Sequence, residues 1–282
     1  MAVSINLEGS CFCIITGASK GIGRALAIEC SRVMGPGSVL LLLARDLQGL
    51  QVTKSLTESS NVKVLTESVD LSSISLNNLD VMLAKVTTDY DISKFSVNMI
   101  IHNVGSVGDV TRTASQLDCV EVWRKYFDLN VFNVSVLNSA FLKAFKSREG
   151  RTVVVNITSL CGIQPFAGLS LYGSGKAARE MYFKVLAEEE PEIVVLNYSP
   201  GPVETDMVDA IIDTATNEGL KEMFVTNKST GKLLKPEQTA KKCLAVLSTG
   251  SYKSGDHVIF KFYDFLIVDN DFLMYDFCNE PG

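Results

Sequence analysis

A tyrosine and a lysine stand four residues apart in the segment LYGSGK, at Tyr172 and Lys176. Residues four apart share one face of a helix, so a helix here would place the ammonium of Lys176 beside the phenol of Tyr172. An unperturbed tyrosine has a pKa of about 10, and a neighbouring cation lowers that pKa because it stabilises the phenolate. The pair is therefore a candidate for general acid catalysis, in which Tyr172 gives a proton to a substrate oxygen.

Apolar segments alternate with helix-like segments along the chain. We predict seven buried strands, at residues 11–16, 38–44, 62–70, 97–105, 151–159, 192–201 and 256–262. The spacing of apolar residues predicts helices at 22–34, 73–88, 116–146, 171–190 and 236–248. A further helix is predicted after the second strand, to about residue 59, and the segment at 203–234 has a looser pattern. Strands that are apolar throughout and alternate with helices indicate a parallel sheet covered on both faces. We therefore predict an α/β fold, a single doubly wound, Rossmann-like domain with a seven-stranded parallel sheet over 1–264, followed by a tail extension at 265–282.

The first predicted strand runs into a glycine-rich turn, TGASKGIG, at residues 16–23. A tight turn needs residues without a Cβ atom, and a pyrophosphate must approach backbone N–H groups at the start of the following helix. Gly17, Gly21 and Gly23 meet both needs in a strand–turn–helix context, so we predict a dinucleotide site here. The alternative is a glycine-rich turn of some other α/β protein.

The residues after the second predicted strand bear on the choice of dinucleotide. A carboxylate at that strand's end would hold the ribose 2′-hydroxyl of NAD, but Arg45 stands there, and a cation can hold the 2′-phosphate of NADP. Lys20 adds a second positive charge, and Asp46 places a carboxylate one position further on. Two cations outweigh one displaced acid, so NADP(H) is the expected cofactor. A solvated Arg45–Asp46 turn is the alternative.

Charge and composition argue against several kinds of partner. The chain has 282 residues, a net charge of −6 and no block of basic residues, so we expect no nucleic-acid partner. The longest apolar run, SVLLLLA at 38–44, is far shorter than the roughly 20 residues that a membrane span requires, and the N-terminus lacks a secretion signal. We therefore expect a cytoplasmic protein without a membrane partner.

The cysteines and histidines are interpreted as structural. The chain has seven scattered cysteines, which we interpret as reduced thiols. Cys11 and Cys13 are expected on opposite faces of their strand, where they would form no metal clip. His102 is assigned to the end of a buried strand, with no cluster of metal-ligand residues near it in the sequence. We predict no metal site.

Four motifs in order, TGASKGIG, NVGS at 103–106, Ser159 and the Y-x-x-x-K pair, resemble the short-chain dehydrogenase/reductase family. The resemblance extends over residues 11–262 and implies NADP-dependent oxidoreductase activity. It implies that Tyr172 is the general acid and that Lys176 holds the nicotinamide ribose and lowers the pKa of Tyr172. Ser159 would hydrogen-bond the substrate oxygen, which agrees with its place at the carboxyl end of a predicted strand. Asn130 would support a proton relay.

The resemblance also gives a set of expected contacts. Asp70 would meet the adenine amine, and residues 199–207 would wrap the nicotinamide. The cofactor-binding residues are expected to be Gly17, Ser19, Lys20, Gly21, Ile22, Gly23, Ala44, Arg45, Asp70, Leu71, Asn103, Tyr172, Lys176, Val203, Thr205 and Met207. The substrate-binding residues are expected to be Ser159, Tyr172, Gly201 and Asp264.

Segments around the expected active site are more closely similar to the pterin-reducing members of the family. They are NVGSVGDVT, NITSLCGIQPFAGLSLYGSGKAARE, LAEEEP, VLNYSPGPVETDM and YKSGDHV. This similarity implies NADPH-dependent reduction of pterin side-chain ketones, namely sepiapterin to dihydrobiopterin and 6-pyruvoyl-tetrahydropterin to tetrahydrobiopterin. The alternatives are a short-chain reductase of other ketones, aldehydes or dicarbonyls, and a non-enzymatic NADP-binding regulatory protein. The latter is disfavoured because Ser159, Tyr172 and Lys176 are all present.

One departure from the family concerns the substrate anchor. The family places an aspartate just after its S-G-x-H-V motif, where it grips the pterin, and this chain has Ile259 at the ungapped position. Asp256 precedes the last predicted strand, whereas Asp264 follows it, at the edge where ligands bind. We therefore predict that Asp264 takes this role. It lies an odd number of residues from Ile259, so the chain must bend or bulge after Phe262.

Two predicted helices suggest a homodimer. Helices that are apolar over a wide arc usually bury a second face, and the resemblance implies pairing through the helices at 116–146 and 171–190. The residues that widen the apolar arc are Val131, Phe132, Val134, Val136, Leu137, Met181, Tyr182 and Phe183.

Overall fold

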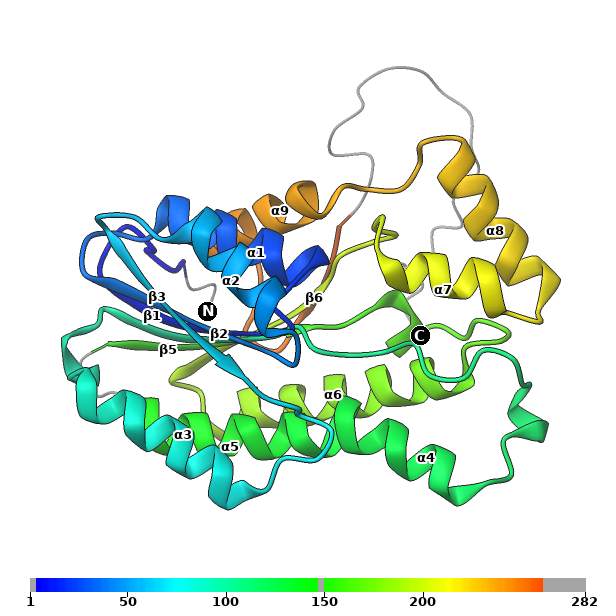
Figure 1. Ribbon diagram of the computed structural model, residues 1–282, viewed down its shortest axis with the longest axis horizontal. Coiled ribbons are helices and arrows are strands. Elements are labelled where there is room, and N and C mark those ends of the chain that lie inside the picture. The colour runs from blue at the N-terminus through cyan, green and yellow to red at the C-terminus, as the bar shows by residue number, and fades with distance from the viewer. Residues whose placement is uncertain (1–3, 147–149, 261–282) are drawn as a thin grey trace, which may run out of the picture.

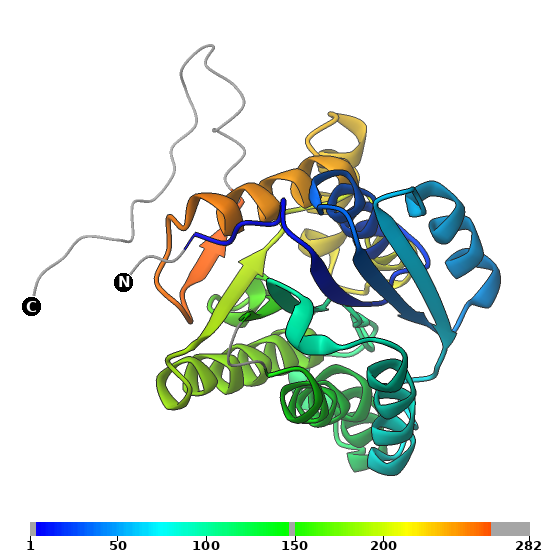
Figure 2. The same cartoon turned by 90° about the vertical axis from the view of Figure 1, so that its left-hand side faces the viewer.

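The predicted parallel sheet is present in the computed structural model, which describes residues 4–146 and 150–260. Its seven strands lie in the order β3-β2-β1-β4-β5-β6-β7, and every neighbouring pair is parallel (Figures 1 and 2). The strands are β1 (Cys11–Thr16), β2 (Ser38–Ala44), β3 (Val62–Ser68), β4 (Val97–His102), β5 (Arg151–Ile157), β6 (Ile193–Ser199) and β7 (His257–Ile259). Strand order reverses between β1 and β4, which is where doubly wound sheets bind ligands.

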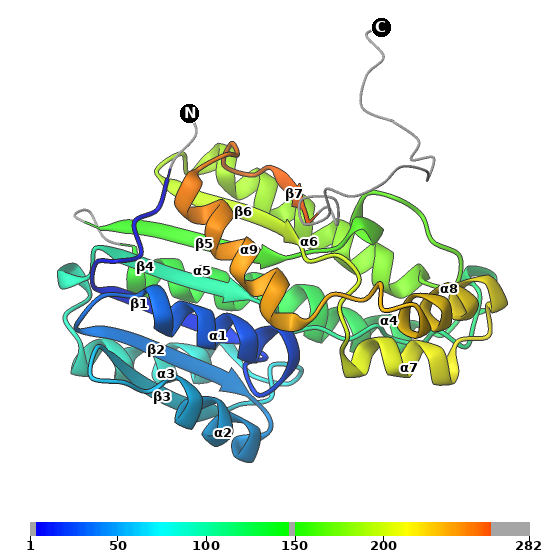
Figure 3. The same cartoon turned by 90° about the horizontal axis from the view of Figure 1, so that it is seen from above.

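Helices cover both faces of the sheet, as the apolar strands require (Figure 1). One face carries α1 (Gly21–Val33), α2 (Leu47–Thr57) and α9 (Pro236–Thr249). The other carries α3 (Leu76–Asp89), α5 (Asn133–Phe145) and α6 (Ser170–Glu189). Beyond the carboxyl ends of the strands lie α4 (Val120–Phe127), α7 (Asp206–Thr214) and α8 (Glu218–Ser229) (Figure 3).

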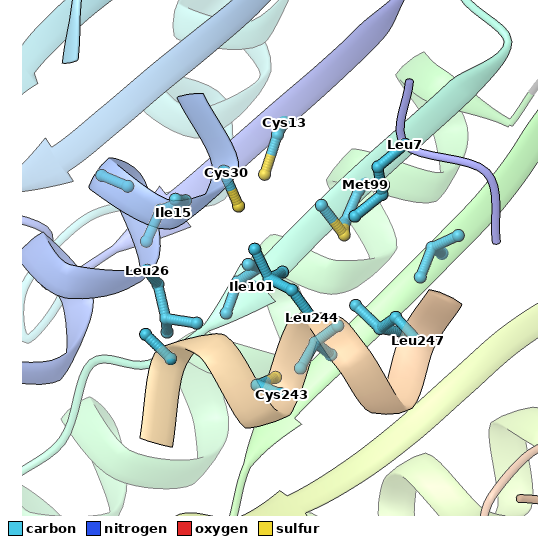
Figure 4. Packing of buried hydrophobic residues seen from close by; sticks show 14 of the residues in the cluster. Leu7, Cys13, Ile15, Leu26, Cys30, Met99, Ile101, Cys243, Leu244 and Leu247 are labelled. Carbon is cyan, nitrogen blue, oxygen red and sulfur yellow. The ribbon is translucent and has the colours of Figure 1, made fainter. Parts of the chain in front are cut away.

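The core between the sheet and α1 and α9 is apolar and rich in thiols (Figure 4). Cys13 of β1 lies in it with Cys30 of α1 and Cys243 of α9. Cys11 belongs to the same cluster, so its predicted placement opposite Cys13 was wrong, because strand residues two apart face the same side. All six cysteines among the described residues are free.

Two segments differ from the predicted elements. The looser segment at 203–234 contains both α7 and α8, and Asn217 caps α8 by accepting a hydrogen bond from the Leu220 amide at 2.9 Å. The predicted helix at 116–146 is divided into α4, a π-helical turn at Asp128–Phe132, and α5. A π turn carries an extra residue and re-aims the side chains within it, often at functional sites.

The last strand is shorter than predicted. β7 ends at Ile259, and the Phe260 amide donates to the Ser199 carbonyl at 2.9 Å. Val258 and Phe260 pack into the core beneath α1 and α9, so His257 and Ile259 face the opposite side, toward α6. Asp264 and the tail at 265–282 lie outside the described residues, so the predicted anchor and the 1–264 boundary stay predictions.

Candidate active site

The predicted Tyr172–Lys176 pair lies on the helix α6, with the Lys176 Nζ 5.5 Å from the centre of the Tyr172 ring. Lys176 is buried and donates a hydrogen bond of 2.6 Å to the Ile157 carbonyl at the end of β5. Ser159, two residues past that carbonyl, caps a short 3₁₀ helix by accepting a hydrogen bond from the Cys161 amide at 3.2 Å. The helix thus brings Tyr172 and Lys176 against the carboxyl end of β5, beside Ser159, as predicted.

Burial dominates the acid–base properties of the pair. Desolvation raises the pKa of Tyr172 to about 12, and the neighbouring Cys161 adds to this, while the Ser159 hydroxyl and the Arg179 guanidinium act in the opposite direction. Burial, followed by repulsion from Arg179, holds the pKa of Lys176 well below its usual range. The predicted net lowering of the Tyr172 pKa is therefore wrong for this geometry, because desolvation outweighs the groups that favour the phenolate.

Asn130 lies in the π turn and is buried. Its amide nitrogen donates to the Tyr126 carbonyl at 2.8 Å, and its Oδ1 accepts from the Ser106 amide at 2.8 Å. Asn130 therefore holds the segment that follows β4 in place. Its predicted part in a proton relay stays a prediction.

The glycine-rich turn has the shape that close packing demands. Gly17 has φ of +66° and Gly21 has φ of +54°, a conformation that glycine adopts without strain. A Cβ atom on Gly23 would overlap the Gly17 carbonyl oxygen. Asn103 fixes the turn from the next strand by donating to the carbonyls of Thr16 at 3.0 Å and Gly17 at 3.2 Å.

The N-terminus of α1 is open to an anion. Its N-cap, Lys20, makes no side-chain capping hydrogen bond, and its first turn has no acidic residue. By contrast, Asp46 and Ser75 cap α2 and α3 by accepting from backbone amides at 2.9 and 3.2 Å. Free N–H groups and the helix dipole at the start of α1 fit a dinucleotide pyrophosphate.

The structure separates the roles of the charged residues near β2. Asp46 uses its carboxylate to cap α2, so it is engaged away from a ribose. Arg45 is exposed at the end of β2, and its charge reaches Asp70. Lys20 forms an exposed ion pair with Asp206 of α7 and so is not a free second cation. Of the two predicted cations, Arg45 is the one that the geometry leaves available.

The other predicted cofactor residues line the carboxyl edge or the loops next to it. Asp70 is exposed, and its carboxylate accepts from the Ser72 hydroxyl at 2.7 Å, which lowers the pKa of Asp70. The Leu71 carbonyl accepts from Asn133 at 2.7 Å. Ser19, Leu71 and Val203 are buried, and Ile22, Ala44, Thr205 and Met207 are half-buried.

The side chains that pack around Tyr172 are apolar. Tyr172 packs with Phe166, Met207 and Phe224 against a cluster supplied partly by α7 and α8. Gly201 has φ of +75°, and its backbone lies against Phe260, just past β7. The end of β7 and the loop at 201–207 therefore border one another, and the predicted substrate contact of Gly201 stays a prediction.

Two further residues were missed from the sequence. Cys161 contacts the site from the 3₁₀ helix, and Arg179 lies one helical turn beyond Lys176. The stripe of residues 172, 176 and 179 follows the i, i+4, i+7 spacing of one helix face, so extending the original motif by three residues would have found Arg179. The described residues contain no group of three or more His, Cys, Asp or Glu side chains placed to hold a metal ion. Nor does any described helix combine the length and apolar character needed to span a membrane.

Comparison with known proteins agrees with this geometry. The family model for short chain dehydrogenase matches residues 12–216. Sepiapterin reductase from Xenopus tropicalis is 39% identical over 257 residues, covering 89% of this chain and 97% of that protein. Benzil reductase ((S)-benzoin forming) from Bacillus subtilis (strain 168) is 30% identical over 244 residues, covering 84% of this chain and 93% of its own length.

A solved structure shows the same fold. L-sorbose reductase from Gluconobacter frateurii, complexed with NADPH and L-sorbose, superposes with a TM-score of 0.73 at 22% identity, covering 91% of this chain and 97% of that one. The doubly wound sheet, the open glycine turn and the Ser–Tyr–Lys site together define a dinucleotide-dependent oxidoreductase. The chain belongs to the short-chain dehydrogenase family.

Proposed function

We propose that this protein is an NADPH-dependent carbonyl reductase that acts on the side-chain ketones of pterins. Its reactions would convert sepiapterin to dihydrobiopterin and 6-pyruvoyl-tetrahydropterin to tetrahydrobiopterin. The observation that carries the proposal is the Ser159–Tyr172–Lys176 site at the carboxyl edge, in a chain 39% identical to a sepiapterin reductase over nearly its whole length. The alternative of a non-enzymatic NADP-binding protein is disfavoured because this site is assembled.

Each site residue has a distinct task in the proposed reaction. NADPH, when bound, supplies the hydride that reduces the carbonyl carbon. Ser159 donates a hydrogen bond to the carbonyl oxygen and orients it toward the phenol, and Tyr172 protonates that oxygen as negative charge develops. Lys176 holds the nicotinamide ribose, and Asn130 belongs to the path by which Tyr172 regains a proton.

NADPH is preferred over NADH because of charge at the end of β2. Arg45 is exposed and close enough to influence Asp70, whereas the Asp46 carboxylate caps α2. A guanidinium suits a phosphate because its N–H groups donate in a planar fork. Thr205 and Met207 would meet the nicotinamide side, and the open start of α1 would hold the pyrophosphate.

The substrate anchor supports a second candidate function. Ile259 faces the α6 side of the sheet, where the family carries an aspartate, and the cluster around Tyr172 is apolar. An apolar diketone would suit that surface without an anchoring carboxylate, and benzil reductases are among the relatives. For a pterin, we propose that Asp264 supplies the missing carboxylate, since a carboxylate pairs with the N–H donors of a pterin.

We also propose a cytoplasmic homodimer. The free cysteines among the described residues support a reducing compartment. Half of the eight residues that suggested a dimer are buried within the chain, namely Val131, Val134, Leu137 and Phe183. Phe132 and Met181 remain 51% and 61% exposed, and they support pairing through α5 and α6. Sedimentation that shows only a monomer at micromolar concentration would reject the dimer.

The test of the proposed function is Tyr172→Phe, which removes the proton donor and keeps the ring. Turnover of sepiapterin with NADPH should fall roughly a hundredfold or more, the scale of general acid catalysis, while NADPH binding stays nearly intact. Tyr182→Phe is the matched control, since Tyr182 lies on the same helix and its hydroxyl donates to the Ser135 carbonyl at 3.3 Å, away from the site. Near-normal turnover by Tyr172→Phe would remove Tyr172 from the mechanism.

A further inference from the structure

Arg179 lies on the same face of α6 as Tyr172 and Lys176, at the i, i+4, i+7 spacing that aligns side chains along a helix. Its side chain is the largest that is fully buried among the described residues, with 1% of its surface exposed. Arginine is rarely buried this deeply without an anionic partner, because removing its charge from water is costly. Its position next to the candidate catalytic pair therefore calls for an explanation.

Among the described residues, the groups that hold the guanidinium are all neutral. It donates to the Asn156 Oδ1 from Nε at 3.1 Å and from NH2 at 2.7 Å, to the His102 carbonyl at 2.8 Å, and to the Val104 carbonyl at 2.9 Å. Within residues 4–146 and 150–260, no carboxylate forms an ion pair with Arg179. The hydrogen bonds to described residues use four of its five N–H donors and leave its positive charge without an anionic partner among those residues.

These hydrogen bonds connect the candidate catalytic helix to the candidate cofactor edge. The segment that Arg179 grips follows β4, and the amides of Asn103 and Val104 in it each donate to the Thr16 hydroxyl at 3.0 Å. Asn103 also donates to the carbonyls of the glycine-rich turn. Arg179 therefore fixes α6 relative to the turn that would hold the cofactor.

The uncompensated charge acts on Tyr172. The groups that influence the phenol are Lys176 and Arg179 from α6, Ser159 and Cys161 from the end of β5 and its 3₁₀ helix, and Tyr126 from α4. Of these, Arg179 is the cation that keeps its charge at neutral pH, although burial lowers the pKa of its guanidinium to about 10. A fixed cation favours the phenolate that Tyr172 becomes once it has given its proton. Lys176 cannot supply this alone, because burial disfavours its own charged form.

We propose that Arg179 is a positioning residue for the proton transfer by Tyr172, through a fixed positive charge behind the phenol and a clamp between α6 and the segment after β4. This inference rests on the proposed carbonyl reduction. It adds to that reaction a cation that never touches substrate or cofactor. A merely structural Arg179 would stabilise the fold and leave the titration of Tyr172 unchanged.

Two variants separate the charge from the clamp. Asn156→Asp keeps an acceptor for the guanidinium and adds a negative charge that neutralises it. Asn197→Asp is its matched control, because Asn197 lies on the far side of Asn156, which donates to it at 2.9 Å. Arg179→Lys loses the planar fork of donors that joins α6 to the segment after β4.

The readout is the pH profile of alcohol oxidation with NADP⁺, in which Tyr172 accepts a proton and the rate rises with pH toward the pKa of Tyr172. Asn156→Asp should move this rise to higher pH by about one unit, the scale of one nearby charge, and Asn197→Asp should move it much less. Arg179→Lys should weaken NADPH binding and lower the rate at every pH, because the hydrogen bonds between α6 and the segment after β4 are lost. Equal profiles in wild type, Asn156→Asp and Asn197→Asp would overturn the charge role, and unchanged binding and rate in Arg179→Lys would overturn the clamp.

A second measurement reads the same titration without turnover. Nuclear magnetic resonance of isotope-labelled tyrosine in the NADP⁺ complex, with the Tyr172 signal assigned by Tyr172→Phe, should show titration beginning at higher pH in Asn156→Asp than in wild type. A common onset contradicts the proposal even if no substrate is turned over. Absence of turnover with every carbonyl, together with the expected shift in onset, would overturn the proposed function and leave the role of Arg179 standing.

Discussion

Arg179 and Glu180 are consecutive residues of α6. Both are almost fully buried and their charges are opposite, yet their hydrogen-bonding partners differ. Glu180 accepts from the Thr158 hydroxyl at 3.0 Å, lies 2.7 Å from the His257 Nδ1, and pairs with Lys184 at 2.7 Å. Arg179, on the side facing β4, donates to acceptors that are all neutral in the part of the chain that the structure describes. One side of the helix holds a compensated anion and the other an uncompensated cation.

The difference assigns the two sides different work. Burial raises the pKa of Glu180, but the hydrogen bonds from His257 and Lys184 outweigh burial and leave that pKa lowered. Glu180 thus connects α6 to the start of β7, and its negative charge is balanced by the side chains next to it. The charge of Arg179 is not cancelled, so its field extends to Tyr172 and Lys176. We infer that Glu180, on the side of α6 that faces β7, stabilises the fold. Arg179, on the side that faces β4, contributes to the reaction.

The largest expected effect on stability comes from removing Glu180 and its contacts with Thr158, His257 and Lys184. Glu180→Ala should lower the free energy of unfolding by about 3 kcal/mol, because it leaves buried partners such as His257 unpaired. Urea unfolding followed by circular dichroism measures this. The folded fraction should keep the wild-type pH profile of turnover. A shifted profile would show that the two sides of α6 are not separate.

The pH dependence of this stability sharpens the same point. Because the pKa of Glu180 is lowered in the fold, its contribution is present above the pKa of an unfolded glutamate, about 4.3, and is lost as pH falls through the folded value. The difference in unfolding free energy between wild type and Glu180→Gln should therefore shrink as pH falls below about 4. A difference in unfolding free energy that stays constant over this range would contradict a stabilising role for the ionised carboxylate of Glu180.

Exposed cations extend the comparison to the cofactor edge. Arg45→Ala should weaken NADPH binding by about 1.5–3 kcal/mol, the scale of a hydrogen bond to a charged group, and change NADH binding little. Lys20→Ala is the control, since Lys20 pairs with Asp206 at the surface, and NADPH affinity should change by less than about threefold. Isothermal titration calorimetry with both dinucleotides measures these values. Equal losses for NADPH and NADH in Arg45→Ala would assign Arg45 to the adenine or the fold.

Removing the predicted pterin anchor, Asp264, should have a smaller effect, and this effect should depend on the substrate. Asp264→Ala should raise the KM for sepiapterin about tenfold, the scale of one charge-assisted hydrogen bond, and leave the KM for a small diketone unchanged. Steady-state kinetics with the two substrates decides this. An unchanged KM for sepiapterin would exclude Asp264 as the anchor, as would a bound pterin without a carboxylate near its amino group.

The parts that the sequence predicted well are those with a strong local signal. Strands β1, β2, β4, β5 and β6 each contain three or more consecutive apolar residues, whereas the edge strand β3 (VKVLTES) does not. The Tyr172–Lys176 spacing itself places both residues on one helix face. α7 and α8 were missed because their apolar residues pack on the cluster around Tyr172 and not on the sheet. A helix that covers a site gives a weaker pattern than one that covers a sheet.

Other features depended on tertiary contacts that no spacing reveals. The carboxylate of Asp46 caps α2, a contact that its position next to Arg45 in the sequence does not reveal. The high pKa of Tyr172 results from burial, which the sequence does not quantify. Arg179 shares the helix face of Lys176 by its spacing, but its burial could not be predicted, because charged residues are normally exposed. The π turn at Asn130 lies inside an unbroken helical pattern.

The most direct test of the account is NADPH consumption by the purified protein with sepiapterin, run beside an apolar diketone such as benzil. We predict that one NADPH is oxidised for each dihydrobiopterin formed, that sepiapterin is preferred over the diketone by kcat/KM, and that Tyr172→Phe abolishes nearly all of this turnover. Reduction of the diketone with no turnover of sepiapterin would contradict the pterin assignment and select the second candidate. Binding of NADPH with no reduction of either substrate would contradict the proposed reaction itself.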